Sequence, residues 1–385
     1  MISYRPSTIY VDPSVQDSPI TQNILRAFPN TPCEYTSEKP SLLNKLDQYS
    51  DPLLEGKKHL WITKNKGKLV KKCGASTSAL PNLICCNYFI LDFSFNCHFE
   101  CVYCFLQEYT NLPMMVVYAN VDEMLKSLTE VFDTTSSQNI RIGTGEMADS
   151  LALDDMTGFS QHLVPFFADQ KKAFLELKTK SAQIQNLLKL NPKGQTVIAW
   201  SLNPPSYIEK YDFKTASFEE RLKAAKECER AGYKIAFHLD PLIAEPTWKE
   251  DYLELVGHIF SHFNPAWVSL GALRFNANLR GIVQKRFPKS PLTVGEFIST
   301  PDGKKRYFRQ LREEMYQTVY GAIVKYNPQM PTYLCMENQV VWQNSLGGVP
   351  LSEQALEKHI VSTVIPSTPE GREESPPEIP RQLPN

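Results

Sequence analysis

Three closely spaced cysteines are the most chemically informative feature of the sequence. Cys97, Cys101 and Cys104 follow the spacing C-x3-C-x2-C within the segment FNCHFECVYCFLQ. Soft thiolate ligands at this spacing can hold three corners of a cubane iron–sulfur cluster from a single loop. The loop contains no fourth cysteine, so one iron would be left free to bind another ligand. We therefore predict a [4Fe–4S] cluster with one open iron.

An open iron predicts a particular chemistry. It can bind the amino and carboxylate groups of S-adenosylmethionine (SAM). One electron from the reduced cluster can then split the C5′–S bond, and the resulting 5′-deoxyadenosyl radical abstracts hydrogen from a substrate. A structural zinc site and a cluster that only transfers electrons are the alternatives. Zinc motifs usually pair two C-x2-C elements or add regularly spaced histidines, whereas only His98 lies within this loop.

Composition restricts the classes of function. The 385 residues suffice for one large domain or two ordinary ones. Forty-one basic and 42 acidic side chains nearly cancel, so net charge does not favour nucleic acid or a membrane. We find neither an apolar run long enough to span a bilayer nor a secretory signal. Nine cysteines without an export signal indicate a reducing compartment, and we expect a cytoplasmic protein.

The elements that must position the cysteines alternate between strands and helices. Helical periodicity is found between six strand-like runs, notably over 121–132, 181–190, 217–232 and 247–263. This alternation predicts an α/β fold with a parallel sheet, in the form of a partial (β/α)6 barrel. A doubly wound sheet is the alternative. The six strand-like runs are 87–93, 139–143, 173–179, 196–202, 233–239 and 266–273.

The order of segments predicts the domain organisation. A small N-terminal α/β domain over 1–57 would contain a strand at 7–13 and a helix at 18–28. The expected turn at Pro301–Gly303 lies in the C-terminal extension. The tail has six prolines in twenty residues and is expected to be disordered. The segments after the N-terminal domain are a lead-in over 58–84, the barrel over 85–275, the extension over 276–365 and the tail over 366–385.

The segments CHFECVYCFLQ (97–107) and SFEERLKAAKECERAGYKIAFHLDPL (217–242) resemble the spore photoproduct lyases, radical-SAM enzymes of DNA repair. The resemblance covers roughly residues 85–290. It implies a partial (β/α)6 barrel, a [4Fe–4S] cluster and SAM as cofactors, and DNA as a candidate partner.

The resemblance also implies roles for individual residues. Tyr103 would pack near the adenine of SAM, and Lys180 and Ser201 would help to hold SAM. Both Lys180 and Ser201 occur at predicted strand ends, where barrel active sites collect. Without the resemblance, Lys180 would be interpreted as a solvated surface lysine. A reducing partner of the flavodoxin or ferredoxin type is also expected. No association with a membrane is expected.

Two departures from the lyases affect the expected reaction. Glu146 occupies the position of the cysteine with which the lyases return a hydrogen atom to the product radical. A carboxyl O–H bond is too strong for that role. The tyrosine after the third cluster cysteine is replaced by Phe105. A radical reaction on a substrate other than DNA is therefore an alternative, and a non-catalytic metal-binding or nucleic-acid-binding protein is a rival from another class.

The segment that contains Glu146 suggests another role for it. Gly143, Thr144, Gly145 and Glu146 follow the second strand-like run. They are similar to the GGE element with which many radical-SAM enzymes bind the amino group of SAM, and glycine permits the unusual backbone angles of such a turn. An ordinary acidic residue at a loop end is the alternative for Glu146.

Candidate substrate groups lie further along the chain. His238 and Asp240 alternate onto one face of the fifth strand and could bind substrate or transfer a proton. A hydrogen-bonded structural histidine is the alternative. The basic segment GKKRYFRQLR (303–312) could bind DNA phosphates and stack on bases, or simply begin a solvated helix.

The other cysteines have weaker signals. A group before the barrel is interpreted as structural, with an auxiliary metal site as the alternative: Cys73, Cys85 and Cys86. The isolated cysteines are expected to pack in the interior: Cys33, Cys228 and Cys335.

Overall fold

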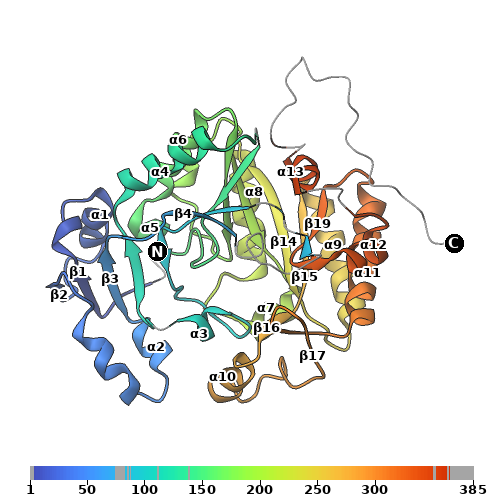
Figure 1. The fold of residues 1–385 in the computed structure, drawn as a ribbon, viewed down its shortest axis with the longest axis horizontal. Helices are drawn as coiled ribbons and strands as arrows, with labels where there is room; N and C mark the ends of the chain where they lie inside the picture. Colours follow the sequence, from blue (N-terminus) through green and yellow to red (C-terminus); the bar gives the residue numbers. More distant parts are fainter. Residues whose placement is uncertain are drawn as a thin grey trace.

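Two sheets organise the chain, a small one near the N-terminus and a large curled one that forms most of the molecule (Figure 1). The structure is a computed structural model. It describes residues 4–73, 83–84, 86, 88–110, 112–137, 139–349, 353–361 and 364. The predicted disorder of the tail over 366–385 concerns residues outside this part of the chain.

The large sheet has the strand order β19-β15-β14-β12-β11-β10-β6-β4 and curls into a partial barrel (Figure 1). All pairs from β6 to β19 are parallel, and only β4 runs antiparallel, against β6. The predicted partial parallel barrel is therefore confirmed. Its strands are β4 (Val70–Lys72), β6 (Phe89–Leu91), β10 (Ile140–Gly143), β11 (Ala173–Thr179), β12 (Thr196–Ser201), β14 (Lys234–Leu242), β15 (Val268–Ala272) and β19 (Thr332–Leu334).

All six predicted strand segments are found in this sheet, as β6, β10, β11, β12, β14 and β15. The sequence did not predict β19, since its three residues are too few to show a period.

Helices connect most of the parallel strands. The helix predicted over 181–190 was wrong, because between β11 and β12 only the 3-10 helix η3 (Leu187–Lys189) is found. The helix α8 (Phe218–Arg230) shows why the prediction over 217–232 succeeded. Ser217 and Glu220 form a reciprocal capping box at its start, and Gly232 follows its end with φ +91°. The other helices of the barrel region are α3 (Leu106–Tyr109), α4 (Val121–Thr134), α5 (Asp154–Thr157), α6 (Ser160–Ala168), α7 (Pro205–Tyr211) and α9 (Trp248–His262), with the 3-10 helix η3 (Leu187–Lys189).

Side chains on alternate strand positions point into the barrel. The rings of Phe174 and Trp267 lie 6.1 Å apart and belong to the face that also contains Glu176, Ser269 and Gly271. Apolar rings therefore occupy the end of the barrel interior near the strand starts. Polar side chains follow toward the carboxyl ends of the strands.

The small sheet has the order β2-β1-β3-β9-β7 and includes the predicted strand at the N-terminus. It takes strands from both sides of residue 57, because β1 pairs with β3 and β3 pairs with β9. The proposed division into domains therefore does not coincide with this sheet and stays a prediction. The elements are β1 (Thr8–Val11), β2 (Cys33–Tyr35), β3 (His59–Thr63), β7 (Ser94–Phe95), β9 (Met115–Tyr118), α1 (Pro19–Ala27), α2 (Pro52–Gly56), η1 (Pro13–Val15) and η2 (Ser41–Gln48).

The C-terminal extension contains a small antiparallel sheet, in which β18 lies between β16 and β17. The expected turn is confirmed, since it joins β17 to β18 with Gly303 at φ +77°. No helix within the described ranges is both long and apolar enough to cross a bilayer. The remaining elements are β5 (Leu83–Ile84), β8 (Glu100–Cys101), β13 (Asp212–Phe213), β16 (Arg274–Asn276), β17 (Ile298–Ser299), β18 (Lys304–Arg306), β20 (Glu337–Asn338), α10 (Leu279–Arg286), α11 (Arg309–Tyr326), α12 (Gln339–Leu346) and α13 (Glu353–Val361).

Candidate active site

The cysteine loop begins at a sharp turn between β7 and β8. Asn96 adopts φ +71°, a conformation that asparagine tolerates better than most residues. Its side-chain amide donates to the carbonyls of Pro113 and Met114 at 3.1 and 3.2 Å, and its side-chain oxygen accepts from the backbone N–H of Cys97 at 2.9 Å. These bonds fix the direction in which the loop leaves the sheet.

A buried group of charges holds the middle of the loop. Glu100 accepts from Lys57 at 2.8 Å through one oxygen and from Arg286 at 2.5 Å through the other. Lys57 also donates to the carbonyl of Phe99 at 2.6 Å, and Gln107 donates to the carbonyl of Cys101 at 3.1 Å. The loop is thus bound to α2, α3 and α10, so it presents its sulfur atoms from a fixed frame.

The three thiols are free, with Cys101 buried and Cys97 and Cys104 half-buried. Burial raises the pKa of Cys97 to about 12, and it also raises the pKa of Cys101 and of Cys104. Each sulfur lies in the electrostatic field of at least one of the others. Desolvated thiols at this spacing suit a soft metal that displaces the thiol protons on binding.

Within the described part of the chain, no three His, Cys, Asp or Glu side chains are gathered closely enough to hold a single metal ion. His98, the extra candidate zinc ligand, packs against the rings of Tyr4 and Phe99 at 5.4 and 4.6 Å. The donor set therefore fits an iron–sulfur cluster.

Asp212 connects the cysteine loop to the ends of two barrel strands. It stands opposite Cys101 in the antiparallel pair of β13 and β8, and it accepts from the phenol of Tyr103. Its other oxygen accepts from Arg221 at 3.0 Å and lies 4.0 Å from the ammonium of Lys180. Lys180 in turn lies 5.5 Å from the centroid of the Tyr103 ring.

Arg221 extends this arrangement to Ser201, since it donates to the Ser201 carbonyl at 2.8 Å. The structure therefore brings together four residues that the sequence analysis singled out: Cys101, Tyr103, Lys180 and Ser201. Burial and the nearby Asp212 carboxylate raise the pKa of the Tyr103 phenol well above its usual value. Tyr103 thus stays protonated and donates to Asp212.

The segment from Gly143 to Glu146 lies at the carboxyl end of β10, as predicted. The absence of a side chain at Gly143 leaves room for the Tyr88 hydroxyl, which would lie 1.4 Å from a Cβ at this position. Gly145 packs against Lys178, whose Cβ would lie 2.9 Å from an added Cβ. Both glycines thus accommodate neighbouring side chains of the protein.

Asp149 fixes the turn that contains Thr144 and Glu146. Its carboxylate accepts from the backbone N–H of Lys180 at 2.7 Å and from the Thr179 hydroxyl at 2.7 Å. The hydroxyl of Thr144 donates to Ser150 at 2.7 Å. The turn after β10 is therefore tied to the end of β11, beside the candidate SAM residues.

His238 points into the barrel as predicted, but it lies deep and is paired. Its Nε2 lies 2.7 Å from Glu176, whose second oxygen lies 3.5 Å from Nε of Arg141. Burial is the main cause that lowers the pKa of His238, to about 4. The Arg141 guanidinium and the hydrogen bond from His238 overcome burial and lower the pKa of Glu176 to about 2. A neutral imidazole therefore donates to a carboxylate at neutral pH.

Asp240 lies one layer nearer the carboxyl end than His238. The Arg274 guanidinium donates to both of its oxygens at 3.1 Å and lowers the pKa of Asp240 to about 2. Arg274 also donates to the sulfur of Cys335 at 3.3 Å. Asp240 is thus an ionised carboxylate that pairs with Arg274 through both oxygens. The roles of His238 and Asp240 toward substrate stay predictions.

Sequence reasoning missed several residues that position the site. Asp212, Arg221 and Asp149 carry no motif of their own, and only the folded chain brings them together. Lys178 was overlooked although it lies two positions before Lys180 on the same strand face. That period-two spacing could have identified it.

The other cysteines lie in different surroundings. Cys86 accepts from Arg141 at 2.8 Å in the barrel interior, and Cys228 is fully buried in α8, as expected for a packing residue. The expectation for Cys33 was wrong, because it is exposed on β2, an edge strand of the small sheet. Cys335 is only half-buried, and Cys85 lies outside the described residues.

The basic segment 303–312 is largely neutralised within the protein. Arg306 makes two hydrogen bonds of 2.6 Å with Asp302, and Arg312 donates to Glu337 at 2.9 Å. Both arginines are buried. The segment therefore offers fewer free charges to a DNA phosphate backbone than its composition indicates.

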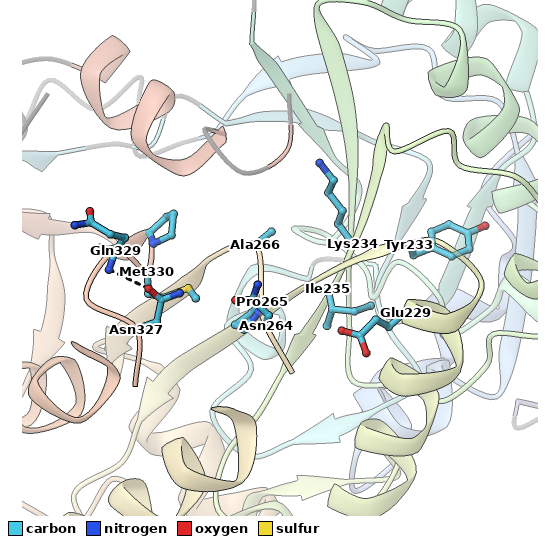
Figure 2. A pocket seen from close by; sticks show the side chains of 11 residues that line it. Glu229, Tyr233, Lys234, Ile235, Asn264, Pro265, Ala266, Asn327, Gln329 and Met330 are labelled. Atoms are coloured by element: carbon cyan, nitrogen blue, oxygen red, sulfur yellow. Dashed lines mark hydrogen bonds between the residues drawn. The ribbon is translucent and has the colours of Figure 1, made fainter. Parts of the chain in front are cut away.

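A pocket of about 410 Å³ is shown in Figure 2. It lies at the amino ends of the barrel strands, opposite the candidate active site. It is formed where β14 begins and by the loops that precede β15 and β19. In parallel barrels the chemistry takes place at the carboxyl ends of the strands, so we do not assign this pocket to the active site. Its lining residues are Glu229, Tyr233, Lys234, Ile235, Asn264, Pro265, Ala266, Asn327, Gln329, Met330 and Pro331.

A three-thiol loop beside the carboxyl ends of a curled parallel sheet defines the class of radical-SAM barrel enzymes. Comparison with known proteins specifies the family: the family model described as spore photoproduct lyase matches residues 4–328. The chain therefore belongs to the spore photoproduct lyase family, whose members are radical-SAM lyases that use a [4Fe–4S] cluster. This membership favours an enzyme over the non-catalytic rival.

Individual relatives agree with the family model. Spore photoproduct lyase of Bacillus subtilis is 24% identical over 309 residues, which cover 76% of this chain and 85% of the relative. The lyase of Clostridium acetobutylicum is 22% identical over 285 residues, covering 73% and 82%. A solved mutant spore photoproduct lyase with bound AdoMet and dinucleoside spore photoproduct has a TM-score of 0.73, at 19% identity, over 86% of this chain and 98% of that chain.

Proposed function

We propose that this protein cleaves SAM reductively and uses the resulting radical to repair a DNA photoproduct. The observation that carries the proposal is the contact network of Asp212, which links the loop of Cys101 to Tyr103, Lys180 and Arg221. Such a network joins the ligands of a cluster to the candidate ligands of SAM in one rigid unit.

Each part of the site has a separate task. Cys97, Cys101 and Cys104 would hold the [4Fe–4S] cluster, which supplies the electron for SAM cleavage. The Lys180 ammonium, only partly compensated by Asp212 at 4.0 Å, suits the carboxylate of SAM. Tyr103 offers a ring face to the adenine.

The turn after β10 and Ser201 would complete the SAM site. The turn formed by Gly143, Thr144, Gly145 and Glu146 supplies backbone groups and a carboxylate for the amino group of SAM. Ser201, at the end of β12, is fixed by Arg221 and borders the same mouth. Burial of the surrounding side chains keeps water away from a reactive radical.

DNA as substrate is supported by the relatives, since solved lyases bind a dinucleoside spore photoproduct. His238 and Asp240 would face this substrate from β14. Glu146, which replaces the hydrogen-donating cysteine, favours the second candidate, a radical reaction on a substrate other than DNA. Both candidates share the SAM chemistry.

The proposal includes a reductant and a compartment. A one-electron donor of the flavodoxin or ferredoxin type would reduce the cluster. We expect a cytoplasmic location, because a reducing compartment keeps the three thiols of the cysteine loop available to iron.

The decisive experiment uses the anaerobically reconstituted full chain with SAM, a chemical reductant and dinucleoside spore photoproduct. Formation of 5′-deoxyadenosine together with thymine dinucleotide supports the proposal. Formation of 5′-deoxyadenosine without repair selects the non-DNA candidate. Absence of 5′-deoxyadenosine refutes both candidates.

A further inference from the structure

The barrel mouth contains a thiol that the cluster does not use. Cys335 directly follows β19, at the carboxyl end of the parallel sheet. Its backbone N–H donates to the carbonyl of Leu270 at 2.8 Å, which extends the pairing of β19 with β15. By strand alternation, Cys335 shares the inward face of Tyr333. Its sulfur thus lies inside the mouth.

Lys178 relates this thiol to the candidate SAM site. Cys335 lies in the electrostatic field of Lys178, and the cluster cysteine Cys101 lies in that of Lys180. The two lysines are two residues apart on β11, so their side chains point to the same face. Gly145, the neighbour of Glu146, packs directly against Lys178. Lys178 is therefore a common neighbour of Cys335 and of the turn that contains Glu146. Glu146 is the position at which the lyases have their hydrogen-donating cysteine.

The surroundings contain a buried polar group that is available to a substrate. The Ser269 hydroxyl is 1% exposed and has no hydrogen-bond partner among the described residues. Ser269 pairs in register with His238 on one side and Tyr333 on the other. It shares the inward face of Gly271, one layer below Cys335. The Ser269 hydroxyl therefore leaves a hydrogen-bonding position that a bound substrate can complete.

We propose that Cys335 donates the hydrogen atom that converts the substrate radical into product, an inference that rests on the proposed function. The S–H bond of Cys335 breaks and a C–H bond forms on the substrate. One hydrogen atom moves without a change in charge, and a thiyl radical remains on Cys335.

The thiol must then be restored. The low-potential donor that reduces the cluster gives the thiyl one electron, and solvent supplies one proton. The Arg274 guanidinium, 3.3 Å from the sulfur, stabilises the thiolate formed by this reduction. Burial raises the pKa of Cys335 to about 12, so the thiolate takes up a proton and the S–H bond is regenerated.

The test follows deuterium from solvent, because a thiol exchanges its hydrogen with D2O. Reconstituted wild-type protein and Cys335→Ser receive SAM, dithionite and dinucleoside spore photoproduct in D2O without added thiols. We expect the wild-type product to carry one solvent deuterium. Cys335→Ser should still form 5′-deoxyadenosine, while repaired product falls about tenfold or more.

Two variants act as controls. Cys33→Ser removes an exposed thiol of the small sheet and should behave like the wild type. Cys86→Ser removes a thiol that accepts a hydrogen bond from Arg141, and it should retain deuterium transfer. Should Cys335→Ser fail to take up the cluster, as judged by its absorbance, Cys335→Ala serves in its place.

The possible failures are distinct. Wild-type protein that forms no 5′-deoxyadenosine contradicts the proposed function itself. Normal repair with solvent deuterium in both Cys335 variants overturns the role of Cys335 alone. Loss of deuterium transfer in Cys86→Ser, with transfer intact in Cys335→Ser, assigns the donor to Cys86 and also overturns the proposal.

Discussion

Asp212 lies directly opposite Cys101, in a two-stranded pair that joins the cysteine loop to the segment after α7. From this position its carboxylate contacts Tyr103, Arg221 and Lys180. A residue without a recognisable motif thus connects the predicted cluster site to the predicted SAM site.

The first prediction concerns this carboxylate. Asp212→Asn keeps the shape of the side chain but leaves the buried guanidinium of Arg221 without its counter-ion. We expect a loss of about 3 kcal/mol in the free energy of unfolding, measured by denaturant titration. Asp169→Asn, which breaks an exposed ion pair with Lys193, should cost less than about 0.5 kcal/mol. Equal stabilities of the two variants would contradict the role of Asp212.

The second prediction concerns SAM affinity. Lys180→Met removes the cation proposed to pair with the SAM carboxylate, while Lys193→Met removes an exposed lysine far from the site. We expect about tenfold weaker SAM binding, or more, for Lys180→Met and no change for Lys193→Met, measured by equilibrium dialysis of reconstituted protein. Unchanged affinity of Lys180→Met would remove this lysine from the SAM site.

The third prediction is a pH dependence of stability. The pKa of His238 is lowered to about 4 in the folded protein, so the unfolded chain binds more protons between about pH 6.5 and 4. Stability from this group is therefore complete above pH 6.5 and is lost as the pH falls through this window. His238→Gln keeps a hydrogen-bond donor near Glu176 but does not titrate.

The measurement compares unfolding free energies of wild type and His238→Gln at pH 7 and pH 4. The wild type should lose about 3 kcal/mol more than the variant. His98 adds a loss of the same sign to both proteins, because burial lowers its pKa to about 3. Identical losses in wild type and variant would show that His238 is not a buried neutral group.

The fourth prediction separates charge from structure in the basic segment. Lys305→Gln with Arg309→Gln removes two of the three cations of this segment that are not fully buried, the third being Lys304. The salt dependence of DNA binding should fall by the equivalent of about one to two phosphate contacts. Arg306→Ala breaks the buried pair with Asp302 and should mainly destabilise the hairpin. A stable Arg306→Ala protein with the larger loss of salt dependence would contradict this assignment.

The sequence predicted the barrel because its signals are local. The six long strand-like runs and the cap at Ser217 are readable from neighbouring residues. The three-residue strand β19 is too short for such a signal. The sequence predicts an isolated packing residue at Cys335, because its partner Arg274 is 61 positions away in the chain.

The same limit applies to the charges of the site. Lys180 and Tyr103 could be singled out by resemblance, but their link through Asp212 spans 109 positions from Tyr103. The sequence shows that segment 303–312 is rich in basic residues. Only the fold shows that Asp302 and Glu337 neutralise two of its arginines, Arg306 and Arg312.

The central claim is a cluster on three thiols with one iron open to SAM, and reconstitution tests it most directly. Wild-type protein loaded anaerobically should contain about four irons and four sulfides per chain and form 5′-deoxyadenosine from SAM after reduction. Cys101→Ala should lose SAM cleavage, whereas Cys33→Ala should retain it. Bound zinc in place of iron, or a Cys101→Ala protein that cleaves SAM at the wild-type rate, would contradict the account.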